Sequence, residues 1–102
     1  MKTIMVRYKT SAAHADVNAA LVRAVFNELK SQAPEGLHYA TYRLEDAVTF
    51  VHVASLDTPE QNPLTALPAF KEFQRELKAR CVEPPVFTEL SIVGSYGAGL
   101  PS

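Results

Sequence analysis

Residues 37–56 read LHYATYRLEDAVTFVHVASL, and within them two runs rich in β-branched and aromatic residues flank a short polar break. Such runs are typical of β-strands. The break at Glu45 and Asp46 fits a tight two-residue connection. The segment therefore predicts a β-hairpin with strands at 37–44 and 47–56.

Outward from this hairpin, alternating residues predict two more strands at 3–9 and 86–93. An apolar stripe from Val17 to Leu29 predicts one helix, with Asn18 among its outward residues. A second helix follows Leu67, Phe70, Phe73 and Leu77 and ends at Pro84-Pro85, with Glu76 and Arg80 spaced to pair on its outer face. The predicted fold is α+β: a ferredoxin-like βαββαβ unit, with a four-stranded antiparallel sheet and two helices on one face.

Bulk properties limit the classes of partner. The length of 102 residues predicts a single domain over 1–97, followed by a flexible C-terminal tail at 98–102. A net charge of −1 without a basic stripe gives no reason to expect nucleic acid as a partner. The apolar runs are shorter than a membrane span, and no signal peptide is recognisable. A single cysteine, Cys81, fits a reducing compartment, so we expect a cytoplasmic protein without a membrane partner.

The strands carry apolar residues on both faces, although two helices can cover only one face of such a sheet. In strand 47–56, one face holds Val48, Phe50, Ala54 and Leu56, and the other holds Ala47, Val51 and Val53. The pattern predicts a homodimer that buries the second face of the sheet. The alternative is a monomer with some exposed valines.

Three segments resemble a known family: residues 39–46 (YATYRLED), 49–53 (TFVHV) and 64–70 (LTALPAF). Together with the element order, they resemble the dimeric α/β-barrel superfamily, in particular antibiotic-biosynthesis-monooxygenase-like domains. The resemblance implies a dimer whose sheets face each other, with a pocket between sheet and helices. The family includes cofactor-free oxygenases, haem-degrading members, isomerases and proteins without known activity. Leu64 and Leu67 stand where the family's His-x-x-Ser-Pro-x-Phe segment has histidine and serine, so roles tied to that segment are not carried over.

Hairpin parity gives the main candidate site. A connection with an even number of residues places 37, 39, 41 and 43 on the same face as 48, 50, 52 and 54. We expect His52 to act as a base, Tyr39 to relay a proton, and Arg43 to hold a carboxylate or enolate oxygen. Thr41 and Phe50 are expected to contact the substrate. The alternative is a polar seam in a dimer interface, with His52 hydrogen-bonded and inert.

Other polar residues give weaker signals. His14 and Asn18 are four residues apart, so they share a helical face and are candidate ligand-binding residues at a pocket mouth; solvation or helix capping is the alternative. His38 is expected on the opposite face from His52. Without a close histidine pair or a cysteine cluster, we expect no metal and no cofactor.

These patterns favour a homodimeric, cofactor-independent monooxygenase-like or isomerase-like enzyme that binds a small aromatic or apolar molecule. The alternative is a non-catalytic ligand-binding or structural dimer, and a pocket that binds haem is a third possibility. An enclosed pocket reached by Tyr39 and His52 favours the first function. A fully packed interior favours the second.

Overall fold

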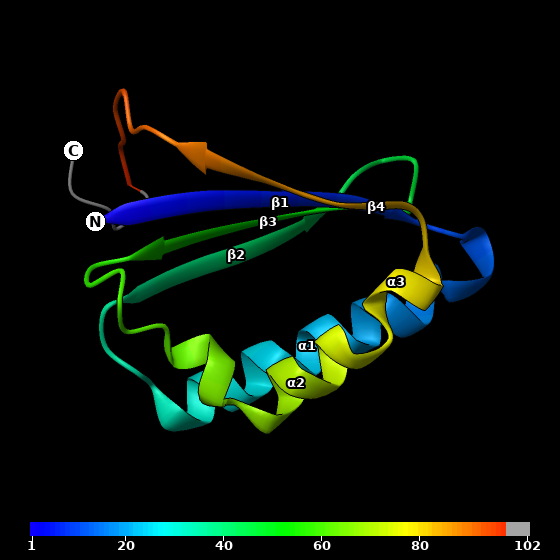
Figure 1. Cartoon of the computed structure of the whole chain (residues 1–102), viewed down its shortest axis with the longest axis horizontal. Coiled ribbons are helices and arrows are strands. Elements are labelled where there is room, and N and C mark those ends of the chain that lie inside the picture. Colours follow the sequence, from blue (N-terminus) through cyan, green and yellow to red (C-terminus); the bar gives the residue numbers. More distant parts are fainter. Residues whose placement is uncertain (98–102) are drawn as a thin grey trace.

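The computed structural model describes residues 1–97, so the tail expected at 98–102 lies outside the described residues. The strands are β1 (Lys2–Thr10), β2 (Leu37–Arg43), β3 (Thr49–Leu56) and β4 (Cys81–Leu90). The helices are α1 (Ala15–Gln32), α2 (Pro68–Arg75) and α3 (Leu77–Arg80), with short 3-10 turns at Ala12–His14 and Pro63–Ala66. All helices lie on one face of the sheet (Figure 1), which confirms the predicted α+β, ferredoxin-like βαββαβ fold.

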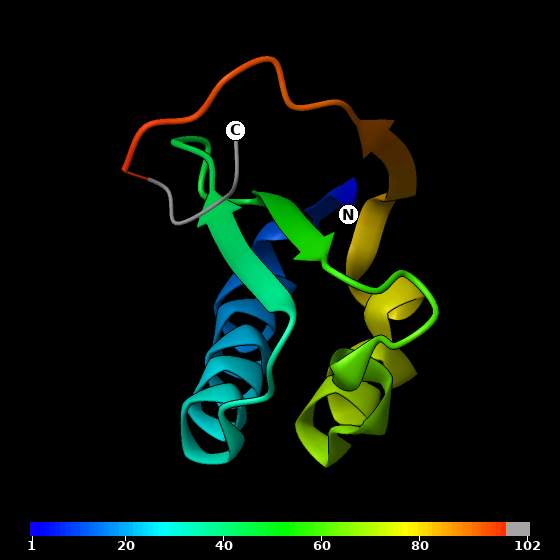
Figure 2. The ribbon, with the colours of Figure 1, turned by 90° about the vertical axis from the view of Figure 1, so that its left-hand side faces the viewer.

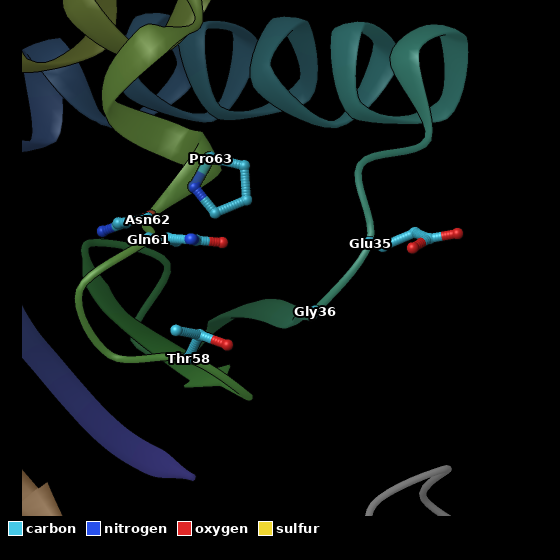
Figure 3. Close-up of a pocket in the computed structure, with 6 residues that line it drawn as sticks. All are labelled: Glu35, Gly36, Thr58, Gln61, Asn62 and Pro63. Carbon is cyan, nitrogen blue, oxygen red and sulfur yellow. The ribbon is translucent and has the colours of Figure 1, made fainter.

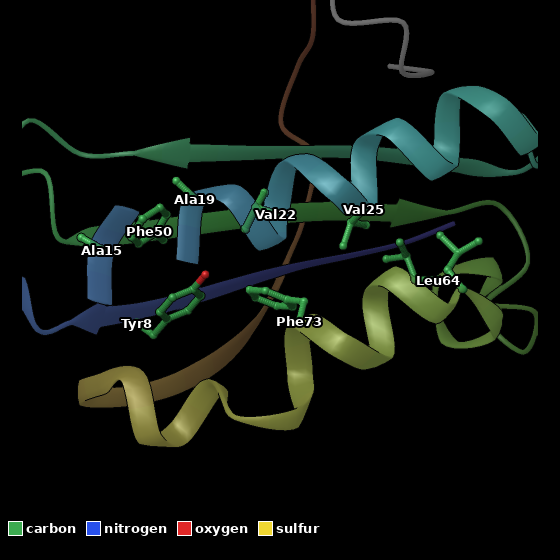
Figure 4. Close-up of a cluster of buried hydrophobic side chains, with 9 residues drawn as sticks. Tyr8, Ala15, Ala19, Val22, Val25, Phe50, Leu64 and Phe73 are labelled. Atoms are coloured by element: carbon green, nitrogen blue, oxygen red, sulfur yellow. The ribbon is translucent and has the colours of Figure 1, made fainter. Parts of the chain in front are cut away.

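The four strands are antiparallel in the order β2-β3-β1-β4, so β3 and β1 are central. In the register of these two strands, Val6 lies opposite His52 and Tyr8 lies opposite Phe50. Helices α1 and α2 run side by side beneath the sheet (Figure 2). The core between these layers includes Tyr8, Phe50, Phe73, Ala15, Ala19, Val22, Val25, Leu64 and Leu67, most of which are labelled in Figure 4.

The hairpin connection is longer than predicted. Leu44 N donates to Thr49 O at 2.9 Å, which leaves a four-residue loop at 45–48 instead of two residues at Glu45-Asp46. The Asp46 side chain organises this loop, because its Oδ1 accepts hydrogen bonds from the backbone N–H groups of Val48 and Thr49. The loop still has an even length. The predicted grouping of residues on one face is therefore confirmed, with Thr41 opposite His52 and Arg43 opposite Phe50.

The buried stripe of α1 is rotated from the predicted one. Its buried residues are Ala15, Asn18, Ala19, Val22 and Val25, whereas the side chain of Val17 is 55% exposed. The prediction that Asn18 faces outward is wrong: it is fully buried. A buried amide is tolerated only where its polar atoms are hydrogen-bonded, and Asn18 has partners from β1 and α3.

The second helical segment and the last strand also differ from prediction. The helix is interrupted at Glu76, and β4 begins at Cys81 and ends at Leu90, so Pro84-Pro85 lies inside a strand and does not precede one. β4 is an edge strand with a register shift against β1, and proline is tolerated in such positions. Arg80 does not pair with Glu76 on an outer surface, because only 5% of it is exposed.

The face of the sheet that points away from the helices, here called the outer face, is partly apolar. By register, Met5, Val51 and Val53 are neighbours on it, and the exposed residues Tyr42 and Val86 flank them. The described residues after β4 arc over this side of the sheet (Figure 2), and Val93 and Tyr96 are fully exposed there. Within residues 1–97, none of the helices combines the length and the apolar character needed to cross a membrane.

Ala47 has a left-handed backbone conformation, with φ of 66°. Such a conformation costs an alanine roughly 1–2 kcal/mol, whereas glycine adopts it freely and loses part of that gain to chain entropy. We expect Ala47→Gly to raise the free energy of unfolding by about 0.5–1 kcal/mol in urea titrations. As a matched control, Ala24→Gly on the exposed side of α1 should lower it by about 1 kcal/mol. A destabilising Ala47→Gly would contradict the strain at this turn.

Candidate active site

A cavity of about 220 Å³ lies between the sheet and α2. Its apolar walls include Ile4, Val6, Ala54, Leu56, Phe70 and Phe73. Tyr8, Tyr39 and His52, which are hydrogen-bonded to one another, form a polar end of this lining, and its other polar residues are Asn62, Thr65 and Gln74. Phe87 of the edge strand β4 also lines the cavity and is 71% exposed, so the cavity reaches the surface beside β4.

His52 is the centre of the polar end, and both of its ring nitrogens have partners. Nε2 lies 2.8 Å from Tyr8 Oη, and Nδ1 lies 2.7 Å from Tyr39 Oη and 3.0 Å from Thr41 Oγ1. Only 5% of the residue is exposed. Burial disfavours the charged imidazolium and lowers the pKa of His52 to about 4, so the ring is neutral at neutral pH.

The hydrogen bonds continue from Tyr8 into the helices. Asn18 Nδ2 donates to Tyr8 Oη at 2.8 Å, and Arg80 Nε donates to Asn18 Oδ1 at 3.0 Å. Arg80 is itself held by Phe73, since Nη2 donates to the Phe73 carbonyl at 2.7 Å and the guanidinium lies 5.5 Å from the ring centroid. Five side chains from three strands and two helices, namely Arg80, Asn18, Tyr8, His52 and Tyr39, thus form one connected chain.

Both tyrosines remain protonated at neutral pH. Burial raises the pKa of Tyr8 well above its ordinary value, against the opposing effect of the hydrogen bond with Asn18. Burial also raises the pKa of Tyr39 to about 12, against the opposing effect of a hydrogen bond with Thr41. Each phenol therefore has one proton to donate and an oxygen that can accept.

The structure brings three of the predicted site residues together and leaves others apart. Tyr39 and Thr41 both contact His52. Arg43 lies on the same face but at the hairpin end, where Nη2 donates to Asp16 Oδ1 at 3.0 Å and Nε donates to the Ala47 carbonyl. Phe50 is in the core, stacked on Tyr8 with centroids 5.6 Å apart. The roles assigned to these residues stay predictions.

The two residues predicted at a pocket mouth do not line this cavity. His14 is exposed, and its Nδ1 lies 2.6 Å from Ser11 Oγ. Asn18 lies behind Tyr8, and its side chain donates a hydrogen bond to that phenol instead of lining the cavity. Across residues 1–97, no group of three or more histidine, cysteine, aspartate or glutamate side chains is arranged to hold a metal ion.

Sequence reasoning did not assign Tyr8 or Arg80 to the site. A signal for Tyr8 was available, because the strand order of a ferredoxin-like sheet puts the strand at 3–9 beside the one that carries His52. Tyr8 lies on the face that this strand turns towards the helices. No comparable signal marks Arg80, since a cation near the end of a helix is usually solvated.

A second depression, of about 250 Å³, lies between the loop that follows α1 and the loop that follows β3 (Figure 3). It is bounded by Glu35, Gly36, Thr58, Gln61, Asn62 and Pro63, and the Glu35 side chain points away from Gln61 and Pro63. Its lining contains neither histidine nor any predicted site residue. The cavity at His52 is therefore the better candidate, because apolar walls with a few convergent polar groups are typical of ligand sites.

Comparison with known proteins supports the fold alone. No family model matches the sequence, and no curated protein matches it. Among solved structures, an antibiotic biosynthesis monooxygenase has a TM-score of 0.75 at 14% identity, over 92% of this chain and 100% of the other. A candidate antibiotic biosynthesis monooxygenase from Nitrosomonas europaea has a TM-score of 0.76 at 11% identity, over 92% and 100%. Another from Deinococcus radiodurans has 0.69 at 16%, over 95% and 97%. The resemblance seen in the sequence is thus confirmed at the level of the fold.

Acidification should destabilise the protein through His52. The unfolded chain protonates its histidines near pH 6.5, but the pKa of His52 in the folded protein is about 4. Between these values the unfolded state binds one more proton, so stability falls as the pH falls. From pH 7 to pH 4.5 we expect His52 to account for a loss on the order of 2–3 kcal/mol, measured by urea unfolding.

The matched variants are His52→Gln and His14→Gln. In His52→Gln, the free energy of unfolding should fall less between pH 7 and pH 4.5. His14→Gln removes an exposed histidine, and its free energy of unfolding should fall as much as that of the wild type. The range stops at pH 4.5 because hydrogen bonds from Thr49 and Val48 hold the pKa of Asp46 at about 2, and that carboxylate adds its own dependence in stronger acid. An equal pH dependence in all three proteins would contradict the burial of a neutral His52.

Proposed function

We propose that residues 1–97 form one ligand-binding domain that works as a homodimer and binds a small, largely aromatic or apolar molecule in the cavity at His52. We further propose that it is a cofactor-independent enzyme of the monooxygenase-like or isomerase-like kind. The observation that carries this proposal is the apolar cavity with Tyr39 and His52 at one end.

The geometry supports distinct roles for the polar residues. A ligand oxygen beside Tyr39 would receive a hydrogen bond from a phenol that stays protonated, which stabilises an enolate-like charge. His52 is neutral, so it can act as the predicted base toward Tyr39 only in the tautomer whose Nδ1 carries no proton. With its proton at Nδ1, it instead supplies a proton to Tyr39. Arg43 is bound to Asp16 and would have to leave it to reach a ligand, so its proposed contribution is at the rim.

The rival function is a dimer without catalysis, in which the same polar residues only lie in the interface between the two copies. The largely apolar cavity that Tyr39 and His52 line supports the enzyme-like function over this rival. The three structural neighbours described above are named as an antibiotic biosynthesis monooxygenase or as candidates for that activity, which supports the same function.

The ligand site is tested by a thermal-shift screen of small aromatic ketones and phenols, since a ligand that binds the folded state raises apparent stability. Hits are then measured by calorimetry on His52→Ala and His38→Ala. His38 lies on the opposite face of the sheet, near Asp57, and is the matched control. We expect His52→Ala to weaken binding about tenfold or more and His38→Ala to leave it unchanged. Equal affinities in the two variants, with both folded, would refute the site.

The dimer is proposed to form through the outer face. Its support is the cluster of half-buried apolar side chains, including Met5, Val51 and Val53, on the face that no helix covers. Partly exposed apolar surface that is contiguous across strands is typical of protein interfaces.

A charge within this cluster should separate the copies. We expect Val53→Asp to convert a dimer to a folded monomer in sedimentation velocity, because a desolvated carboxylate is strongly unfavourable in an interface. Val17→Asp places the same charge at an exposed valine on α1 and should leave the dimer intact. A wild-type monomer at micromolar concentration, or a Val53→Asp dimer, would contradict this interface.

A further inference from the structure

We propose that Arg80, Asn18 and Tyr8 form a one-way hydrogen-bond chain that fixes His52 as its Nδ1–H tautomer and thereby makes Tyr39 a donor toward the cavity. The chemical class of ligand follows from that polarity: an apolar body with an acceptor oxygen, such as a ketone or its enolate. The statement about the ligand rests on the proposed function, whereas the statement about the tautomer does not.

The chain begins at Arg80, which can only donate. Its position is set independently of Asn18, because the Phe73 carbonyl and ring hold the other side of the guanidinium. The Asn18 oxygen must therefore face Arg80 Nε, at 3.0 Å, and the Asn18 nitrogen must face the other way. The two ends of a side-chain amide differ only in their hydrogen-bonding, so a fixed cation settles which end is which.

The polarity passes next through Tyr8. Asn18 Nδ2 can only donate, so the Tyr8 oxygen accepts that bond at 2.8 Å. Within the described part of the chain, His52 Nε2 is the other partner of this hydroxyl, also at 2.8 Å. The single proton of Tyr8 is thus directed to Nε2, which must accept it. A neutral ring that accepts at Nε2 carries its own proton at Nδ1.

The last step turns Tyr39 toward the cavity. With its proton at Nδ1, His52 donates to the oxygens of Tyr39 and Thr41, at 2.7 and 3.0 Å. The Tyr39 oxygen then accepts from His52 and from the Thr41 hydroxyl, whose hydrogen bond favours the ionised phenol, so its own O–H is left to point into the cavity that the residue lines. A donor at the end of an apolar cavity selects an acceptor oxygen on an apolar ligand.

Asn18, Tyr8 and Arg80 are positioning residues here, and Asn18→Asp tests them sharply. The substitution keeps the shape of the side chain and its pairing with Arg80, but a carboxylate only accepts. Tyr8 should then donate to the new carboxylate, and His52 should donate from Nε2 to Tyr8. The tautomer inverts, and Tyr39 directs its proton to Nδ1 and away from the cavity. Asn27→Asp, at an exposed asparagine of the same helix, is the matched control.

The readout is the tautomer of His52, taken from the two ring-nitrogen shifts of protein labelled with nitrogen-15 histidine at pH 7, with His52→Gln to assign the signal. We expect Nδ1–H in the wild type and in Asn27→Asp, and Nε2–H in Asn18→Asp. An Nε2–H signal in the wild type overturns the proposal, even if Asn18→Asp fails to fold. An unchanged tautomer in folded Asn18→Asp overturns it as well.

The ligand class is tested with acetophenone and ethylbenzene, which have similar shapes but differ in the acceptor oxygen. We expect the ketone to bind the wild type about tenfold more tightly, and Tyr39→Phe and Asn18→Asp each to abolish this preference. Equal binding of both probes by the wild type overturns the ligand class. Binding of neither probe contradicts the proposed function. The tautomer measurement then still tests the hydrogen-bond chain from Arg80 to His52 by itself.

Discussion

The interaction on which the rest of the structure depends is the burial of a neutral imidazole, His52, between the sheet and the helices. An unpaired polar group at such a position costs about 1–3 kcal/mol, so both ring nitrogens need partners. These partners come from the two flanking strands: Tyr8 from β1, and Tyr39 and Thr41 from β2. Because a slip of one residue would move every side chain to the other face, the three strands have one register that satisfies His52.

The same requirement extends into the helices. Tyr8 is buried, and its oxygen is satisfied by Asn18, which obliges α1 to turn a polar residue into the core. Asn18 in turn needs a donor for its oxygen, and Arg80 supplies it. A buried guanidinium is costly unless it is hydrogen-bonded, and the Phe73 carbonyl and ring offset that cost. In residues 1–97, no buried side-chain nitrogen or oxygen is left without a partner.

This network also explains what the sequence could and could not predict. Local periodicity gives the element order and therefore the fold, and the even length of the hairpin connection gives the grouping of Tyr39, Thr41 and His52 on one face. Asn18 and Arg80 could not, because each looks like a surface residue and is buried only through a partner distant in sequence. The rotated stripe of α1 was missed for a similar reason, because a pattern of apolar residues gives no sign that Asn18 is buried. The prediction that the last strand begins after Pro84-Pro85 was wrong for another reason, since an edge strand tolerates proline.

A satisfied polar network beside an apolar cavity has a chemical consequence. Water that enters such a cavity finds few partners on walls like Val6, Ala54 and Phe70, so an apolar ligand replaces it favourably. Leu64 is buried and lines the cavity, so it adds no polar group there. The connected polar network is therefore at the end where Tyr39 and His52 meet. Because both ring nitrogens of His52 already have partners, the group of this network that can reach a ligand is the Tyr39 hydroxyl, and the buried hydrogen-bond chain controls its direction.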